Sequence, residues 1–310
     1  EVDNRNNGVC IRAVLTSAQR ELFIERICRE RPKVASIHRI TVSEKIEAKN
    51  PYTDFRITPS RSESDEVTQV APDIAVCSEC LRDRKMQAHR LQYPFVNCTH
   101  CGPRFSIIRD LPYDRGQTTM SAFSMCPSCQ KEYTTVCDRR FHAEPVACNH
   151  CGPSYYALYN KVKVTNYPEL LDLSSRLLRE GEVITTKGIG GYHLICDARN
   201  EKAVSRLREV KQRDGKPFAV LFRDIENIRR YVSLNEAEEE SLLSWRRPIV
   251  LLKQLRALAP SVNPGMETLG CMLPYMPIHS DWFEQLDTPA LVMTSGNISE
   301  CPMAITPEEA

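Results

Sequence analysis

Residues 98–103 read CTHCGP, and residues 148–153 repeat them as CNHCGP, fifty positions further on. Each of these Cys-x-x-Cys pairs follows an earlier one, and the gaps between successive pairs are 17, 24 and 18 residues. Two such pairs at this spacing are typical of a structural zinc site, because each pair offers two thiolates to one metal ion. The sequence therefore predicts two Zn²⁺ sites built from eight cysteines, which are Cys77, Cys80, Cys98, Cys101, Cys126, Cys129, Cys148 and Cys151.

The four pairs could share two metal ions in three ways, and the repeat favours one zinc in residues 77–101 and one in residues 126–151. His100 and His150 lie inside complete Cys₄ units, so we expect them to face solvent or to support the thiolates. A disulfide framework is the alternative. Because the chain starts EVDNR, without the apolar stretch of a signal peptide, we expect a reducing, cytoplasmic compartment instead.

The charge balance argues against nucleic acid or a membrane surface as a partner. The 310 residues include 41 Lys and Arg and 40 Asp and Glu, for a formal charge of +1. Residues 77–151 carry ten basic and seven acidic side chains, and two Zn²⁺ on eight thiolates leave this segment at about −1. The longest apolar runs, such as residues 249–252, are far below the roughly 18 residues of a membrane span.

The segments before the cysteines indicate a small α+β unit. Residues 9–14 and 35–47 alternate like strands, and residues 18–29 have helical spacing of apolar side chains. This pattern is that of a ferredoxin-like unit without its first strand and helix, ending at residue 58. Residues 59–70 are polar and predict a linker.

The eight cysteines define a region over residues 71–160, and an α/β domain is predicted after it. Helical patterns alternate with short apolar runs typical of buried strands, at residues 170–178, 183–186, 192–196, 200–213, 218–222, 249–252 and 290–294. Residues 306–309 read TPEE, a helix start, and the chain ends one residue later. We therefore expect a piece of a longer product, truncated inside this domain.

Three groups of residues in the α/β domain together predict a phosphate site. Residues 187–191 read KGIGG, a glycine-rich turn that starts with Lys187 and can present backbone N–H groups to an anion. Lys211, Arg213 and Lys216 place cations at a predicted helix end. Ser295 and Asn297 directly follow an apolar run, and ligands in α/β proteins are commonly bound at strand ends.

Residues 93–105, YPFVNCTHCGPRF, and residues 138–143, DRRFHA, closely resemble the HypF family, and with the cysteine spacing the resemblance covers essentially the whole chain. Members are carbamoyltransferases that mature [NiFe] hydrogenases. The resemblance implies a partial acylphosphatase-like domain over residues 1–58, with Asn4 orienting the attacking water. It implies a double zinc-finger region over residues 71–160, and a truncated YrdC-like nucleotide-binding domain over residues 161–310. The family's phosphate-binding arginine segment and its Kae1-like domain lie outside this chain.

The resemblance also implies a reaction. Carbamoyl phosphate is hydrolysed to carbamate, which reacts with ATP, accompanied by Mg²⁺, to give carbamoyl-AMP. The carbamoyl group then passes to the C-terminal cysteine of the maturation protein HypE. Threonylcarbamoyl-AMP synthases resemble the last domain too, but their Pro-Thr-x-x-Val-Tyr-Gly segment is replaced here by residues 187–193, KGIGGYH. Synthesis of threonylcarbamoyl-AMP and a zinc-stapled nucleic-acid-binding module remain the alternative functions.

Overall fold

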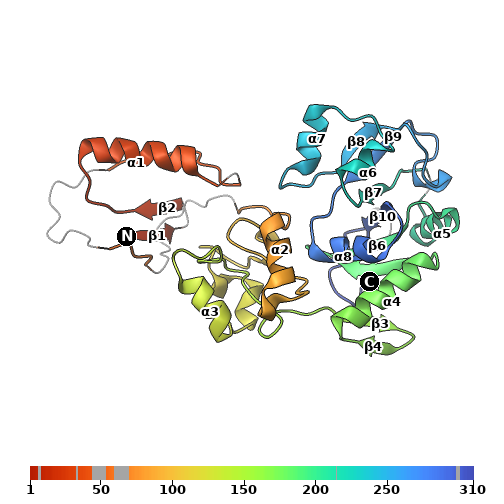
Figure 1. Cartoon of the computed structure of the whole chain (residues 1–310), viewed down its shortest axis with the longest axis horizontal. Coiled ribbons are helices and arrows are strands. Elements are labelled where there is room, and N and C mark those ends of the chain that lie inside the picture. Colours follow the sequence, from red (N-terminus) through yellow and green to blue (C-terminus); the bar gives the residue numbers. More distant parts are fainter. Residues whose placement is uncertain (6–7, 33, 44–53, 59–69, 214, 298–300) are drawn as a thin grey trace. The chain divides into compact units, whose positions relative to one another are not determined.

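The computed structural model describes residues 1–5, 8–32, 34–43, 54–58, 70–213, 215–297 and 301–310 (Figure 1). The chain forms two compact units, and each is described by itself. One unit contains residues 1–72 and 107–122, and the other contains residues 73–106 and 123–310. The predicted linker lies outside the described residues, except for Val70. No helix in the described parts of the chain is both long enough and apolar enough to cross a membrane.

The first unit begins with an antiparallel hairpin of β1 (Val2–Arg5) and β2 (Gly8–Ile11), followed by helix α1 (Ser17–Glu30). A capping box starts α1, because Thr16 and Gln19 exchange side-chain and backbone hydrogen bonds. The hairpin encloses a fully buried Asp3, whose carboxylate accepts hydrogen bonds from Arg5 at 2.8 Å and Arg12 at 2.7 Å.

The strand predicted over residues 35–47 is wrong in its described part. Residues 35–43 have no regular secondary structure, and residues 44–47 lie outside the described residues. Ile37, Ile40 and Val42 are 38–50% exposed, so the described part of this unit does not bury their alternating side chains. The predicted strand over residues 9–14 also ends earlier, at Ile11.

The cysteine region of the second unit contains two short helices, α2 (Ser78–Met86) and α3 (Pro127–Thr134). Each helix begins directly after the first cysteine of a pair, so Cys77 and Cys126 stand at the N-cap positions. This start places the second cysteine, three residues on, within the first helical turn. A hairpin of β3 (Ala157–Tyr159) and β4 (Val162–Val164) follows.

The remainder of the second unit is an α/β domain around a six-stranded sheet with the order β5-β6-β10-β7-β9-β8. Only the β7–β9 pair is parallel, and the other neighbours are antiparallel. The helices are α4 (Tyr167–Arg179), α5 (Glu201–Lys211), α6 (Ile225–Arg229), α7 (Glu236–Leu243) and α8 (Pro277–Gln285). The strands are β5 (Ile184–Lys187), β6 (Tyr192–Asp197), β7 (Ala219–Phe222), β8 (Val250–Lys253), β9 (Thr268–Met272) and β10 (Ala290–Ser295).

Two apolar clusters bury the two faces of this sheet. Val204 and Leu207 of α5 pack in the cluster that contains Val292 of β10, and Trp282 of α8 packs in the cluster that contains Met293 of the same strand. Because successive strand residues point to opposite faces, β10 contributes to both clusters and reads as an unbroken apolar run. This burial holds the end of β10, where the predicted Ser295 lies, in a fixed place.

Apart from the helix expected at Thr306, the predicted strands and helices of the α/β domain are confirmed to within three residues at their ends, whereas strand β9 and helices α6, α7 and α8 were not predicted. The centre of β9 is Gly270, where an added Cβ would lie 3.2 Å from the Ile249 side chain. Such a glycine weakens the strand pattern while it permits a close approach. The helix expected from Thr306 is not formed in the described residues, although the Glu309 carboxylate accepts the N–H of Thr306 at 3.2 Å, as in a helix cap.

Candidate metal centres and nucleotide site

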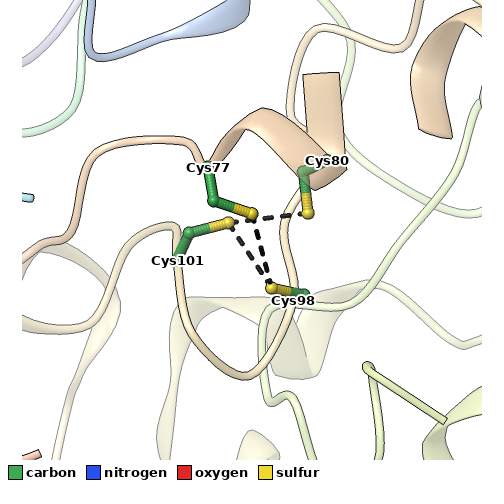
Figure 2. Close-up of side chains that lie close together, drawn as sticks. All are labelled: Cys77, Cys80, Cys98 and Cys101. Carbon is green, nitrogen blue, oxygen red and sulfur yellow. Dashed lines mark hydrogen bonds between the residues drawn. The ribbon is translucent and has the colours of Figure 1, made fainter. Parts of the chain in front are cut away.

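The first cysteine tetrad, defined as Cys77, Cys80, Cys98 and Cys101, has its four sulfur atoms within 4.8 Å of one another. Figure 2 shows the four side chains pointing toward a common centre, two from the start of α2 and two from the facing loop. Sulfur–sulfur distances are 3.9 Å between Cys77 and Cys98, 3.7 Å between Cys98 and Cys101, and 3.6 Å between Cys80 and Cys101.

The second cysteine tetrad consists of Cys126, Cys129, Cys148 and Cys151, with sulfur atoms again within 4.8 Å of one another. Cys148 lies 3.7 Å from Cys126 and 3.8 Å from Cys151. The structure therefore groups the eight thiols in the two sets that the sequence repeat favours. The second tetrad is the more accessible one, because Cys126 and Cys151 are both partly exposed, whereas only Cys77 is in the first.

Both tetrads fit a zinc ion. With Zn–S bonds of about 2.3 Å, the ligands of a regular tetrahedron lie about 3.8 Å apart, close to the observed separations and far from a disulfide bond. Hydrogen bonds with Cys101 lower the pKa of Cys77 and Cys98 and raise the pKa of Cys80. Thiols this close cannot all ionise unless a cation neutralises them, and Zn²⁺ would supply that charge.

An arginine from the opposite repeat lies against each tetrad. Arg139, from the second repeat, donates to Cys80 of the first tetrad at 3.4 Å, and Arg90, from the first repeat, donates to Cys129 of the second at 3.4 Å. Burial disfavours the charge on Arg139, but the nearby thiolate of Cys80 holds its pKa above the ordinary value. Each set of ligands is thus partly neutralised by a cation from the other half.

The hydrogen bonds between the two repeats follow a pseudo-twofold pattern. Each bond in one direction has a counterpart in which both partners are shifted by fifty residues, and carboxylates of α2 and α3 hold the arginines in the same way. The pairs are Thr99 N–H to Arg139 C=O and Asn149 N–H to His89 C=O; Arg140 Nε to Asn97 C=O and Arg90 Nε to Ala147 C=O; and the ion pairs Asp83–Arg140 and Glu132–Arg90. The two repeats therefore fold as one interlocked module.

The two histidines within the repeats are not drawn into the tetrads. His100 and His150 are exposed, and each donates its backbone N–H to a cysteine, at 3.4 Å from Cys98 Sγ and Cys148 Sγ, respectively. These N–H groups stabilise the thiolates, which is a supporting role.

Lys211, Ser295 and Asn297 lie together at the end of strand β10. Lys211 is 3% exposed, and its ammonium donates to the backbone oxygen of Ser295 and to the backbone and side-chain oxygens of Asn297 at 3.0 and 3.1 Å. The Ser295 hydroxyl donates to the same Asn297 side chain at 2.6 Å. Burial lowers the pKa of Lys211, and the neighbouring Arg213 adds to this shift.

Arg213 joins this cluster from the turn after α5. Its guanidinium donates to the C=O of Pro217 at 2.8 Å, reaches Thr294 Oγ1 at 3.5 Å, and lies over the Phe218 ring. The Lys216 side chain is exposed. Arg213 also borders a cavity of about 350 Å³, which Arg208, Gln212 and Ser261 line as well, whereas a second cavity of about 190 Å³ lies elsewhere, beside Asp197 and Thr288.

Two residues beside this cluster were not predicted. Arg208 and Arg213 both lie over the Phe218 ring, and Arg208 donates to the Arg213 C=O at 2.9 Å. Thr294 is buried, and its hydroxyl lies 3.5 Å from the Arg213 guanidinium. Arg208 precedes Lys211 by three residues on α5, so the helical spacing could have indicated it. Thr294 precedes Ser295 and was read only as part of an apolar run.

The glycine loop, residues 187–191, connects β5 to β6 and closes with a hydrogen bond from Gly188 N–H to Gly191 C=O at 2.8 Å. Gly190 has a φ of +86°, a conformation that glycine adopts without strain. The Lys187 ammonium donates to the C=O of Ile305 at 2.8 Å, so it is not directed to the Lys211 cluster. The loop itself adjoins that cluster, because β6 pairs His193 with Ser295.

Asn4 lies in β1 opposite Val9, and its side chain lies outside the described residues. The structure therefore leaves its proposed contact with water as a prediction.

The two cysteine tetrads and the six-stranded sheet define a class of protein in which a zinc-binding double-finger module is joined to a YrdC-like α/β domain. A family model described as "HypF finger" matches residues 76–108 and 125–158, and the Sua5–YciO–YrdC model, described as "Telomere recombination", matches residues 176–310. The chain belongs to the HypF family.

Individual relatives agree with this assignment. The chain is 43% identical to the carbamoyltransferase HypF of Rhodobacter capsulatus over 83% of its own length and 34% of the relative's. A crystal structure of full-length HypF in a phosphate- and nucleotide-bound form superposes with a TM-score of 0.92 at 44% identity, covering 99% of this chain and 40% of that one. The chain thus spans about two fifths or less of these relatives. A threonylcarbamoyl-AMP synthase of Bacillus subtilis is 27% identical over 44% of this chain and 41% of its own length.

Proposed function

We propose that this chain carries the adenylating part of a HypF-type carbamoyltransferase of hydrogenase maturation. The observation that carries the proposal is the cluster of Lys211, Arg213, Ser295 and Asn297 at the end of β10, beside the glycine loop. Cations, a hydroxyl, an amide and flexible backbone in one place are the groups that bind and neutralise phosphates.

The proposed reaction has three steps. Water hydrolyses carbamoyl phosphate to carbamate and phosphate, with Asn4 orienting the water. A carbamate oxygen then attacks the α-phosphorus of ATP, and the bond to pyrophosphate breaks, giving carbamoyl-AMP. Finally the thiolate of the C-terminal cysteine of a HypE-type partner attacks the carbamoyl carbon, and AMP leaves.

Charge stabilisation is the main role of the cluster in the second step. Lys211 and Arg213 neutralise the negative charge that grows on the phosphate oxygens, with Lys216 as an outer cation. Ser295 and Asn297 donate hydrogen bonds to phosphate or carbamoyl oxygens, for which they exchange part of their present internal bonding. The metal-binding side-chain clusters found among the described residues all lie in the zinc module, so we assign Mg²⁺ to the phosphates of ATP itself.

In this proposal the two tetrads have a structural role and no catalytic one. Their Cys₄ ligand sets leave no open position for a substrate, which is the mark of a structural zinc site. We also propose a reducing, cytoplasmic location, because cysteine pairs that serve as zinc ligands are typical of such a compartment.

An ATP–pyrophosphate exchange assay tests the adenylation step on the 310-residue chain. Freshly dissolved ammonium carbamate supplies the acceptor, so the first step is bypassed, and threonine with bicarbonate is the comparison. We expect exchange with carbamate, and its loss in Lys211→Ala. Exchange that requires threonine would instead assign the chain to threonylcarbamoyl-AMP synthesis, and no exchange with either acceptor would refute the proposed site.

A further inference from the structure

A tyrosine of the zinc module donates a hydrogen bond to the glycine loop of the proposed nucleotide site. Tyr155 stands four residues after Cys151, the last ligand of the second tetrad, and its hydroxyl donates to the C=O of Lys187 at 2.9 Å. Lys187 is the first residue of the loop, at the end of β5. A residue of the zinc module is therefore hydrogen-bonded to the first residue of the loop.

The Tyr155 ring is held by aromatic neighbours on two sides. The Phe95 ring centroid lies 4.7 Å away, and the Tyr167 ring is stacked at 6.3 Å. Phe95 stands three residues before Cys98 of the first tetrad, so the contact joins chain segments that adjoin both tetrads. All three rings pack against the apolar cluster that contains Trp282 of α8.

The chain between the second tetrad and Tyr155 has little freedom. Gly152 follows Cys151, and a Cβ at this position would lie 2.0 Å from the Tyr93 hydroxyl and 2.6 Å from the Ala147 side chain. Tyr93 is 1% exposed and fixed within the module. This close packing holds the backbone directly after Cys151 against Tyr93 and Ala147 of the zinc module.

The other end of the glycine loop is held by the nucleotide domain. Gly188 and Gly191 close the turn, Tyr192 N–H donates to the C=O of Ala304 at 2.8 Å, and Ile189 packs against the same cluster as Tyr155. The Tyr155 hydroxyl thus adds a hydrogen bond to the loop from outside the nucleotide domain.

We propose that Tyr155 is a positioning residue for the nucleotide site: its hydrogen bond to Lys187 fixes the glycine loop so that the loop N–H groups meet the phosphates. The inference rests on the proposed function, because the loop matters only if nucleotide binds beside it. It assigns the zinc module a defined task in adenylation, which is to hold the loop before ATP arrives. Preorganisation of this kind strengthens binding because less ordering remains to be done.

The substitution Tyr155→Phe removes the hydroxyl alone, and Tyr156→Phe on the exposed neighbouring ring is the matched control. Three quantities are measured on the 310-residue chain: ATP affinity by calorimetry, backbone hydrogen exchange over residues 188–191, and zinc content. Loss of one such hydrogen bond changes an equilibrium constant by about three- to tenfold. For Tyr155→Phe we therefore expect ATP affinity to fall by about that factor and loop exchange to accelerate, while two zinc ions per chain are retained.

ATP affinity equal to that of the unsubstituted chain would overturn the inference, even if loop exchange accelerates. Loss of zinc in Tyr155→Phe would overturn it too, because the tyrosine would then serve the metal module rather than the loop. An equal loss of affinity in Tyr156→Phe would show that the effect is not specific to the Lys187 bond. If the unsubstituted chain fails to bind ATP, the proposed function fails first and the inference falls with it.

Discussion

A buried ion pair ties the first tetrad's helix to the nucleotide domain, and breaking it should be costly. Arg84 of α2 is 4% exposed and forms two parallel hydrogen bonds with Asp281 of α8, one of them at 2.8 Å. The Tyr167 hydroxyl donates to the same carboxylate at 2.6 Å, so three helices meet there. Asp281→Ala would leave a buried guanidinium and a phenol without their shared acceptor.

Removal of one partner from a buried pair costs about 3–5 kcal/mol, because the remaining charge stays desolvated. For a unit of this size such a loss lowers the melting temperature by about 6–20 °C. Thermal and guanidinium unfolding of the zinc-loaded chain measure it directly. In the double variant Arg84→Met with Asp281→Asn, the charge is gone and the amide still accepts from Tyr167, so we expect most of the loss to be recovered.

The neighbouring pair of Lys85 and Glu284 is the control, because both side chains are more than half exposed. Glu284→Ala should change the unfolding free energy by less than about 1 kcal/mol. If Asp281→Ala costs no more than this control, or if the double variant is as unstable as the sum of its single changes, the reasoning is refuted.

Cys98→Ser should remove one zinc ion per chain and lower the melting temperature, whereas Cys137→Ser, at an exposed cysteine outside both tetrads, should change neither quantity. Zinc analysis and scanning calorimetry measure the two effects, and a full zinc content in Cys98→Ser would contradict the assignment of this ligand. A chromogenic chelator should remove zinc first from the more exposed second tetrad, so Cys126→Ser should lack the fast phase of zinc release. A fast phase that persists in this variant would show that the first tetrad loses its zinc first. Burial lowers the pKa of His279 from 6.5 to about 3, so the unfolded chain binds the proton first. The unfolding free energy that is present above pH 6.5 is therefore lost as the pH falls toward 3, by up to about 1.4 kcal/mol per pH unit. In His279→Phe the unfolding free energy should fall less steeply with decreasing pH over this range.

Local patterns made most of the α/β domain predictable. The run at residues 290–294 is buried on both faces of a sheet, and β10 occupies Ala290–Ser295. The same reasoning failed at residues 35–43, where apolar and polar residues alternate but the described residues do not bury the apolar ones. The hairpin turn at Asn160 and Lys161, both with positive φ, was also missed, although an asparagine between two short apolar runs is a known indication of such a turn.

The functional sites also have a part that local sequence patterns predict and a part that they do not. The tetrads follow from cysteine spacing, because each pair is a local turn and the repeat indicates the grouping. The contact of Arg139 with Cys80 spans 59 residues, and that of Arg90 with Cys129 spans 39, so no local pattern contains them. The interlocking of the repeats therefore had to come from the structure. Lys187 was expected with the other cations, but its ammonium is bonded to Ile305, a contact across 118 residues.

The most direct test of the account is mass-spectrometric detection of the adenylate. The full-length protein is incubated with ATP, Mg²⁺ and ¹³C-labelled carbamoyl phosphate, and its acid-quenched products are compared with those of Lys211→Ala. Labelled carbamoyl-AMP that appears with pyrophosphate, and that is lost in the variant, is the predicted result. Hydrolysis of carbamoyl phosphate with no labelled adenylate, or an adenylate formed equally well by Lys211→Ala, would contradict the assignment of adenylation to this site.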